Sequence, residues 1–409
     1  MNFIKNTFQT GSFMIATAIL FATSCNKEPE QILGMPVTQS GLSLGETLAS
    51  TPDDSLFNKM IVKAGMAATL TNKSLGYTLF VPNNAAVIAS FGGSLASANA
   101  TINALPAASL AGIVKYNMIP QKLLTTQIVH GFPNMQMPTD IILNPTNSFV
   151  RMTSFPSKSG ATGTTFYYNN APLTSTENVV ANGVIHHTAF IVAPPTRVLK
   201  DTIGRVSNLS YFRAAIARAD SGSTGLSKFD SLLNYPVVNM TVLAPNDAAF
   251  QTLIFGLAFQ GYLSTRPTPY TGADSAVANA MATGAVAAGP AFLNTNNVTT
   301  ALVKGIIAYH LLATNKGVGF QPNIRVFSVN FPSTPIFVKT LVNASVAVHP
   351  GIMAKANYAG PFVTALTFSS FGSFPPGGAP FSYTANTVGM DRLAVNGIFH
   401  IIDKVLLPQ

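Results

Sequence analysis

The sequence predicts two copies of one domain that mixes helices and strands, and two observations support that prediction. The chain has 409 residues, which is enough for two domains of about 100–200 residues each. Three landmarks also occur twice in the same order: an apolar strand that runs into a helix start, an amphipathic helix that ends in an aromatic residue, and an Asn-Gly turn before a last apolar strand. Because each copy contains both kinds of element, we expect two domains with similar frameworks.

The first 25 residues have the pattern of an export signal. Lys5 supplies positive charge, and residues 13–22 form an apolar core. At about 1.5 Å per residue this core covers about half of a ~30 Å hydrocarbon layer, so it is too short to span a membrane. The segment Ala22-Thr23-Ser24-Cys25 resembles a lipobox, in which a bacterial lipoprotein is cleaved before a cysteine that then carries a lipid. Ala22 departs from that pattern, which usually has a larger aliphatic residue at this position.

Cys25 is the only cysteine in the chain, so it can form no internal disulfide. We therefore expect residues 1–24 to be a lipoprotein signal peptide and Cys25 to be the lipid attachment site. The alternative is an unmodified thiol in a discarded N-terminus. Residues 25–42, which contain charge, Pro and Gly, are predicted to be a tether. The expected location is a bacterial membrane, with the outer membrane favoured and display at the cell surface as a further option. The sequence does not determine inner or outer membrane, or the orientation.

Only 9% of the residues are charged, against about 25% in a typical protein, so neutral polar groups must cover most of the surface. The formal net charge is +9, but the Lys and Arg residues are spread thinly and form no basic stripe. Recognition of nucleic acid needs such a stripe. Nucleic acid is therefore not an expected partner.

The first landmark is a strand over residues 77–82 and again over residues 240–245. β-Branched and aromatic residues favour a buried strand, and a proline ends it because proline cannot donate to the ladder. Asn83 and Asn246 follow, and each is expected to cap the next helix with its side-chain oxygen.

The other two landmarks are a helix ending in an aromatic and a turn before the last strand. Leu302, Ile306 and Tyr309 share one helical face, and the same pattern ends at Tyr116 in the first copy. Asn-Gly then precedes an apolar run in each copy and predicts a tight turn, because both residue types tolerate positive φ.

Together these segments resemble the fasciclin (FAS1) family. Its hallmarks are a Thr-rich strand that enters an "APT/N-D-A-F" helix start, a Tyr-His pair and a closing "NGVIHVIDKVLLP", which residues 396–408 match almost throughout. The resemblance covers about residues 43–409. It implies an α+β fold with two tandem fasciclin-like domains, residues 43–197 and 198–409, each a wedge of short β-strands with several small α-helices. The residues that match the family motif are Pro82, Asn83, Tyr116, Gly183 and His186 in the first copy, and Pro245, Asn246, Tyr309, His310, Gly397 and His400 in the second.

The first copy departs more from the family pattern than the second. Asn117 stands where the Tyr-His pair has its histidine, and Ala189 stands where the closing segment has its acidic residue. The second copy keeps both, as His310 and Asp403. Its landmarks are also further apart: Pro245 and Gly397 are 152 positions apart, whereas Pro82 and Gly183 are 101 apart.

The additional residues of the second copy are expected on its surface, where insertions often carry function. Residues 256–297 are rich in Ala, Gly and Thr and predict a small-residue helix with loops. Residues 368–383 are rich in Pro, Gly and Ser, and their aromatic rings are candidates for binding sugars or a protein. The alternative is that this loop folds back over the core of its own domain. The candidate partner-binding residues are Phe368, Phe371, Phe374, Phe381 and Tyr383.

No motif for catalysis, metal or cofactor binding stands out. There is no zinc-helix spacing, phosphate loop, G-x-S-x-G elbow or Asp-rich calcium loop. His186 and His400 are expected to make structural hydrogen bonds, His310 to pack in the core, and His187 to be an exposed neighbour. We therefore predict a protein that is not an enzyme and needs no cofactor or metal.

These expectations combine into a non-enzymatic, membrane-anchored, extracytoplasmic adhesion or interaction protein. Its expected partner is a cell-surface or matrix protein or a polysaccharide. The alternative function is an accessory glycan-binding surface lipoprotein for nutrient capture.

Overall fold

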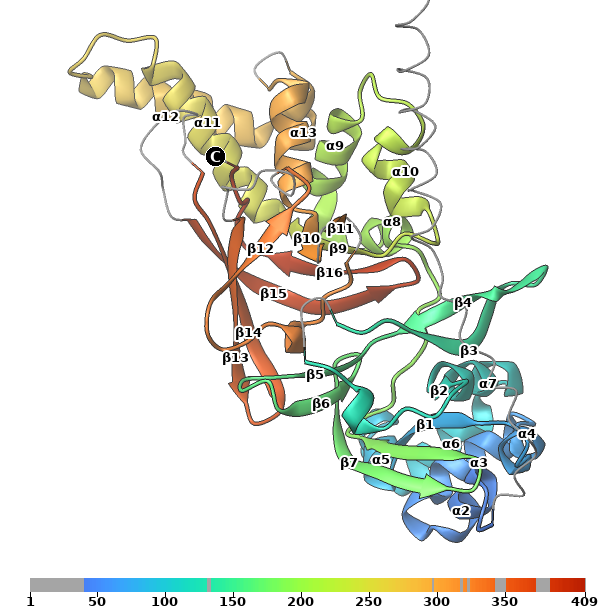
Figure 1. The fold of residues 1–409 in the computed structure, drawn as a ribbon. Helices are drawn as coiled ribbons and strands as arrows, with labels where there is room; N and C mark the ends of the chain where they lie inside the picture. The colour runs from blue at the N-terminus through green and yellow to red at the C-terminus, as the bar shows by residue number, and fades with distance from the viewer. Residues whose placement is uncertain are drawn as a thin grey trace, which may run out of the picture. The chain divides into compact units, whose positions relative to one another are not determined.

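The computed structural model describes residues 40–130, 134–295, 298–316, 319–321, 324–342, 351–372 and 383–408, and Gly41–Gln409 form one compact unit (Figure 1). Cys25 lies outside the described residues. Within them no single helix is long and apolar enough to cross a membrane; α5 and α6 pass that test only as a pair, across a bend of 75°.

In its described residues, 43–130 and 134–197, the first domain contains six short α-helices, two 3₁₀ turns and eight strands. Its helical elements are α2 (Leu44–Ser50), η1 (Pro52–Asp54), α3 (Ser55–Lys63), α4 (Ala67–Thr71), α5 (Asn84–Ser90), α6 (Leu95–Ala104), α7 (Ala107–Tyr116) and η2 (Thr125–Gln127). Its strands are β1 (Tyr77–Pro82), β2 (Met118–Ile119), β3 (Met137–Asn144), β4 (Asn147–Ser154), β5 (Pro156–Ser159), β6 (Thr165–Tyr168), β7 (Ala171–Val180) and β8 (Gly183–Thr188).

The second domain has a similar order of elements, with two longer helices between its first strand and the helix that ends at Tyr309. Its helical elements are α8 (Leu199–Gly204), η3 (Ser207–Leu209), α9 (Ser210–Ala219), η4 (Gly225–Ser227), α10 (Phe229–Asn234), α11 (Asp247–Leu263), α12 (Gly272–Ala287), η5 (Gly289–Asn294), α13 (Thr300–Tyr309) and η6 (Ser328–Asn330). Its strands are β9 (Met240–Pro245), β10 (Leu312–Lys316), β11 (Gly319–Gln321), β12 (Ile336–Thr340), β13 (Ile352–Ala359), β14 (Phe362–Ser370), β15 (Tyr383–Ala394) and β16 (Gly397–Ile402).

Each domain is built on a sheet in which its first and last strands pair in parallel. The sheet of the first domain has the order β2-β1-β8-β7-β6-β5, and that of the second has the order β11-β10-β12-β13-β14-β15-β16-β9. Tyr77 faces Gly183 in the first parallel pair, and Met240 faces Gly397 in the second, so the register is the same. This agreement confirms the predicted α+β fold with two repeated domains.

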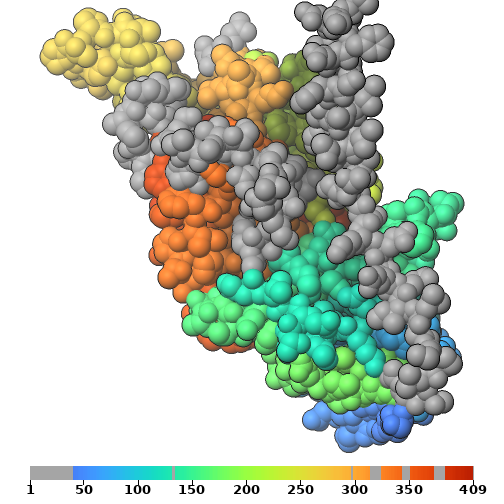
Figure 2. All heavy atoms as spheres, viewed as in Figure 1, coloured from blue at the N-terminus to red at the C-terminus, as the bar shows by residue number. Residues whose placement is uncertain are grey.

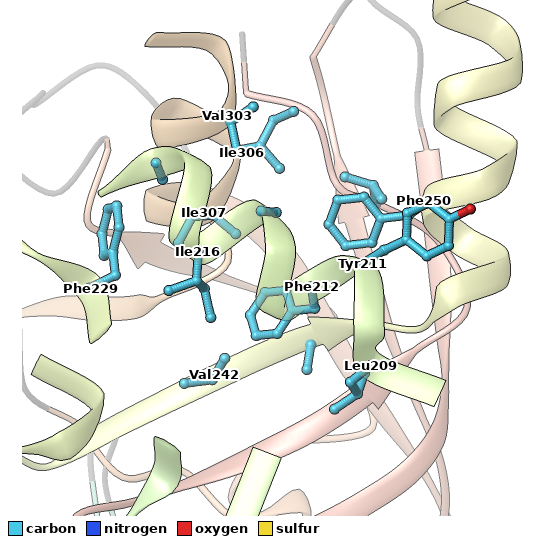
Figure 3. Close-up of a cluster of buried hydrophobic side chains, with 14 of the residues drawn as sticks. Leu209, Tyr211, Phe212, Ile216, Phe229, Val242, Phe250, Val303, Ile306 and Ile307 are labelled. Carbon is cyan, nitrogen blue, oxygen red and sulfur yellow. The ribbon is translucent and has the colours of Figure 1, made fainter. Parts of the chain in front are cut away.

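Helices cover one face of each central strand pair and form the main apolar cores. In the second domain, Figure 3 shows Leu209, Phe212 and Ile216 from η3 and α9 packed with Val242 of β9 and with Ile306 of α13. The first domain packs α3, α7 and β1 in the same way. The helical stripes predicted from the sequence therefore face the cores.

The strand-to-helix junctions form as predicted in both domains. Asn83 Oδ1 accepts a hydrogen bond from Ala86 N at 2.9 Å, and Asn246 Oδ1 accepts one from Ala249 N at 2.8 Å. Each bond satisfies one of the free N–H groups at the start of α5 or α11. The predicted caps are confirmed.

Candidate functional site

The motif asparagine before the last strand ties three segments together. Asn182 Oδ1 accepts from Leu44 N at 2.7 Å, and its Nδ2 donates to Leu70 O and Asn72 O. Asn396 repeats all three bonds in the second domain, with Leu199 N, Leu233 O and Tyr235 O. Both asparagines are buried, so they connect the opening helix to the sheet inside the domain.

The glycine after that asparagine is needed for space and not for its backbone angle. The predicted tight turn forms in both domains, at residues 181–182 and 395–396, but neither Gly183 nor Gly397 has the positive φ that was given as its reason. A Cβ on Gly183 would lie 2.3 Å from Tyr77 O, and one on Gly397 would lie 2.4 Å from Met240 O. The close approach of the parallel strand excludes any side chain at either position.

The histidine of each last strand is structural, as predicted. His186 Nε2 lies 2.9 Å from Leu123 O, and its Nδ1 accepts from Glu177 N. His400 makes the same two kinds of bond in the second domain. Accepting at Nδ1 requires a neutral ring with its proton on Nε2, and burial lowers the pKa of both histidines.

The middle of each domain carries the Tyr-His position of the family. His310 Nδ1 lies 2.8 Å from Ile306 O, and its Nε2 accepts from Leu406 N at 3.0 Å. Asn117 stands at the equivalent place and donates to Ile113 O and Val192 O. His310 is fully buried, and burial lowers its pKa to about 4. The motif tyrosines, Tyr116 and Tyr309, are also buried, so these positions build the core.

Part of the segment predicted as an aromatic loop, residues 368–383, belongs to the strands β14 and β15. Phe368 lies in β14 and is fully buried, in edge contact with Phe331. Its proposed role in partner binding is therefore wrong, because a ring with no exposed surface packs in the core. Tyr383 begins β15 and is half-buried. The centres of the Phe371 and Phe337 rings lie 6.1 Å apart. Phe374 and Phe381 lie outside the described residues.

Tyr383 also borders a small pocket at the base of α11. Lys404 Nζ lies 5.5 Å from the centre of the Tyr383 ring. The pocket encloses about 70 Å³ and is lined by residues of α11, by Tyr383 and by the segment after β16: Ala249, Thr252, Leu253, Gly256, Lys404, Val405 and Leu407. It combines an aromatic ring, a cation and an apolar wall.

The insertion before the Tyr-His helix forms a helical hairpin, α11 and α12, here called the insertion hairpin (residues 247–287). The predicted small-residue helix is α12. Its main contacts are with α11 and η5, and the outer end of the hairpin stands clear of the other described atoms (Figure 2). Exposed apolar side chains lie along it, with Tyr270 and Val277 each 44% exposed and Met281 53% exposed.

A polar cluster that the sequence did not reveal lies in the first domain. His187 Nδ1 is 2.7 Å from Ser175 Oγ, and His187 Nε2 is 3.1 Å from Asp54 Oδ1. We call these three residues the polar trio. His187 is not an exposed neighbour, since its side chain is only 19% exposed. Asp54 is 133 positions from His187, so no local pattern in the sequence indicates that these side chains meet.

The described residues contain no group of three or more His, Cys, Asp or Glu side chains that could hold a metal ion.

Comparison with known proteins identifies the first domain. A sequence model of the fasciclin domain matches residues 52–189. Among solved structures, a FAS1 domain pair from the insect cell adhesion molecule fasciclin I matches with 15% identity and a TM-score of 0.32, covering 86% of this chain and 95% of that chain. No curated protein matches the chain.

The second domain repeats the framework of the first at each motif: the parallel strand pair, the caps Asn83 and Asn246, the anchors Asn182 and Asn396, and the last-strand histidines. Residues 52–189 therefore form a fasciclin domain, and the residues that follow build the framework of that domain a second time.

Proposed function

We propose that this chain is an adhesion or interaction protein that binds a cell-surface or matrix partner through the insertion hairpin of its second domain. Fasciclin domains are known in cell adhesion and interaction proteins, and the family is generally not enzymatic. In both domains the asparagine and histidine side chains of the framework motifs bond to the backbone of their own domain, so these motifs stabilise the fold. Binding then depends on what the domains add to the framework.

The observation that carries the proposal is the exposed apolar surface of the insertion hairpin. The insertion hairpin, residues 247–287, contains only three charged residues, Asp247, Arg266 and Asp274. Phe255 and Phe259 stack with ring centres 6.0 Å apart on a helix that is apolar around most of its circumference. Phe255 and Phe259 are half-buried, whereas Tyr270, Val277 and Met281 are exposed, and an exposed apolar surface of this kind favours contact with another molecule.

The test uses beads coated with purified protein and cells of the same strain or matrix preparations as the target. Replacing Tyr270, Val277 and Met281 by Ser is expected to reduce bead attachment at least tenfold while leaving the thermal unfolding midpoint nearly unchanged. The matched control is Phe149→Ser, because Phe149 is 77% exposed on the first domain. Full attachment by the triple variant would exclude the hairpin as the binding surface.

A polysaccharide partner is favoured by one local feature, the pocket beside Tyr383. An aromatic ring next to a cation can stack on a sugar ring and bond its hydroxyl groups. Tyr383→Ala should then abolish signals on a glycan array, and the hairpin variant should keep them. Signals lost in the hairpin variant alone would place glycan binding on the hairpin instead.

We also propose that a lipid on Cys25 anchors the protein to a membrane after export. The lipobox-like segment and the short apolar core before it support this proposal. Cys25→Ala is expected to release the protein into the periplasm or medium, as measured by fractionation. Continued partition with membranes would overturn the anchor. Protease treatment of intact cells would then distinguish surface display from a periplasmic position.

A further inference from the structure

The polar trio of the first domain has the order of a hydrogen-bond relay that ends at the protein surface. Asp54 lies at the end of η1, and its side chain is 2% exposed. His187 lies on β8, and its side chain is 19% exposed. Ser175 lies on the neighbouring strand β7 and is exposed. Ser175 and His187 are opposite each other in the strand register. A buried carboxylate therefore orients a half-buried imidazole, which in turn contacts an exposed hydroxyl.

The hydrogen bonds determine which nitrogen of His187 carries the proton. Both carboxylate oxygens of Asp54 lie close to Nε2, at 3.1 and 3.2 Å, so Nε2–H is the donor to Asp54. The lone pair on Nδ1 is then free to accept the Ser175 O–H, whose oxygen is 2.7 Å away. In this arrangement the imidazole can remove a proton from the hydroxyl, and the carboxylate stabilises the imidazolium that forms.

The second domain shows that the fold does not need these polar side chains. The 3₁₀ turns η1 and η3 are equivalent, so Leu209 stands at the position of Asp54. The register partners Ser175 and His187 are replaced by Gly389 and Ile401. Leu209 and Ile401 are buried in one apolar core (Figure 3 shows Leu209). Burying a carboxylate costs free energy, whereas burying a leucine does not. Packing alone therefore does not explain why the first domain has the polar trio at this place.

We propose that Ser175 is a nucleophilic serine that accepts an acyl group from activated carboxylic esters, with His187 as its general base and Asp54 as a positioning residue. The Ser175 oxygen bonds to the ester carbonyl carbon while its proton moves to His187 Nδ1. The bond from that carbon to the leaving oxygen then breaks, and the alcohol departs with the proton from His187. The product is an ester on Ser175, which water hydrolyses by the same route. This activity is independent of the binding surface proposed above.

The test uses the full chain and a fluorophosphonate probe, with the labelled residue located by peptide mass spectrometry. The Ser175 oxygen bonds to phosphorus and fluoride leaves, so labelling reports nucleophilicity without turnover. Ser175 is expected to react about 10²-fold or more faster than an ordinary exposed serine such as Ser74, which is the range that a positioned base supplies. Ser175→Ala should remove that label.

Three further variants separate a relay from a purely structural contact. Asp54→Asn should slow labelling at least tenfold and move the His187 ring proton from Nε2, a change that ring-nitrogen NMR shifts detect, while Asp54→Glu should restore part of the rate. The combined variant Asp54→Leu, Ser175→Gly, His187→Ile takes the residues of the second domain, so it should fold and show no fast label.

Labelling of Ser175 at the rate of Ser74 would overturn the proposal. It would also be overturned if Asp54→Asn left the labelling rate unchanged. Neither result would affect the hairpin experiment, because the probe and the beads report on different domains.

Discussion

The two domains place different side chains on one backbone plan, and the clearest case is the junction between the opening helices and the last strand. There the first domain holds Asp54 against His187, whereas the second packs Leu209 and Ile401. Nearby, the asparagine anchors Asn182 and Asn396 make identical sets of bonds in both. The positions that bond to the backbone are therefore constrained by the fold, and the positions between them are available for functions that differ.

The connections between the first strand and the Tyr-His helix show the same contrast between a shared framework and parts that differ. The first domain connects β1 to α7 through the short helices α5 and α6, and the second replaces these with α11, α12 and η5. Both connections begin with the same asparagine cap. A capped strand-to-helix junction thus tolerates a long helical hairpin without a change in the parallel strand pair beside it.

The largest matched effect is expected from the two anchor asparagines. Asn182→Ala and Asn396→Ala each remove three hydrogen bonds, two of them buried, and leave backbone groups without partners, which should cost about 3–5 kcal/mol of unfolding free energy. Hydrogen exchange measured by mass spectrometry would assign the loss to one domain at a time. Losses that differ strongly between the two variants would break the equivalence of the domains.

Acid should distinguish the domains, because only the second has a histidine at the Tyr-His position. The pKa of His310 is about 4 in the folded protein and about 6.5 in the unfolded chain, so between these values the unfolded state binds a proton that the folded state does not. Stability of the second domain should therefore fall as pH decreases from 6.5 to 4, by on the order of 3 kcal/mol.

The control for this pH effect is His310→Asn, which copies Asn117 of the first domain. His186 and His400 both have lowered pKa values and affect both domains, so the excess in the second domain is assigned to His310. Urea unfolding at several pH values measures it. An equal pH slope with and without His310 would show that its burial is not the cause.

The close-packed glycines should give a smaller, equal pair of effects. Gly183→Ala and Gly397→Ala place a methyl group against a backbone oxygen, and relief requires the parallel strands to separate. We expect a loss of about 2 kcal/mol in each domain, within the usual range for overpacking. Gly204→Ala is a suitable control, because its Cβ would meet nothing within 4 Å. Tolerance of alanine at either strand position would mean that the close approach is not needed there.

The helix caps should give the smallest effect. Asn83→Ala and Asn246→Ala are each expected to lower the unfolding free energy by about 1 kcal/mol. Asn→Asp at the same positions should keep most of the stabilisation that the cap supplies. Thermal unfolding of the single variants measures this. A much larger loss at Asn246 would indicate that the insertion hairpin depends on its cap more than α5 does.

Sequence reasoning found the framework because its signals are local. A strand followed by proline and a capping asparagine occupies consecutive residues, as at Tyr77–Pro82 and Asn83, and it recurs in the second domain. The glycine of the Asn-Gly pair was located correctly but explained wrongly, since the close approach of Tyr77 O to Gly183 comes from strand pairing across more than 100 residues.

The site was harder to predict because its parts meet only in three dimensions. Phe368 was assigned to a loop by the Pro and Gly residues that follow it, but it belongs to β14 and its ring is in the core. The polar trio joins residues 54, 175 and 187, which no local motif connects. Local composition predicted that residues 256–297 contain a helix, but not that it forms an exposed hairpin.

The most direct measurement is a transplant of the insertion hairpin between the domains. In one variant the second domain receives the short connection of the first, and in another the first domain also receives the hairpin in place of α5 and α6. If the hairpin carries binding, attachment of coated beads is lost in the first variant and returns in the second. Attachment that stays in the first variant, or that does not return in a folded second variant, would contradict the proposal that this chain binds through the hairpin.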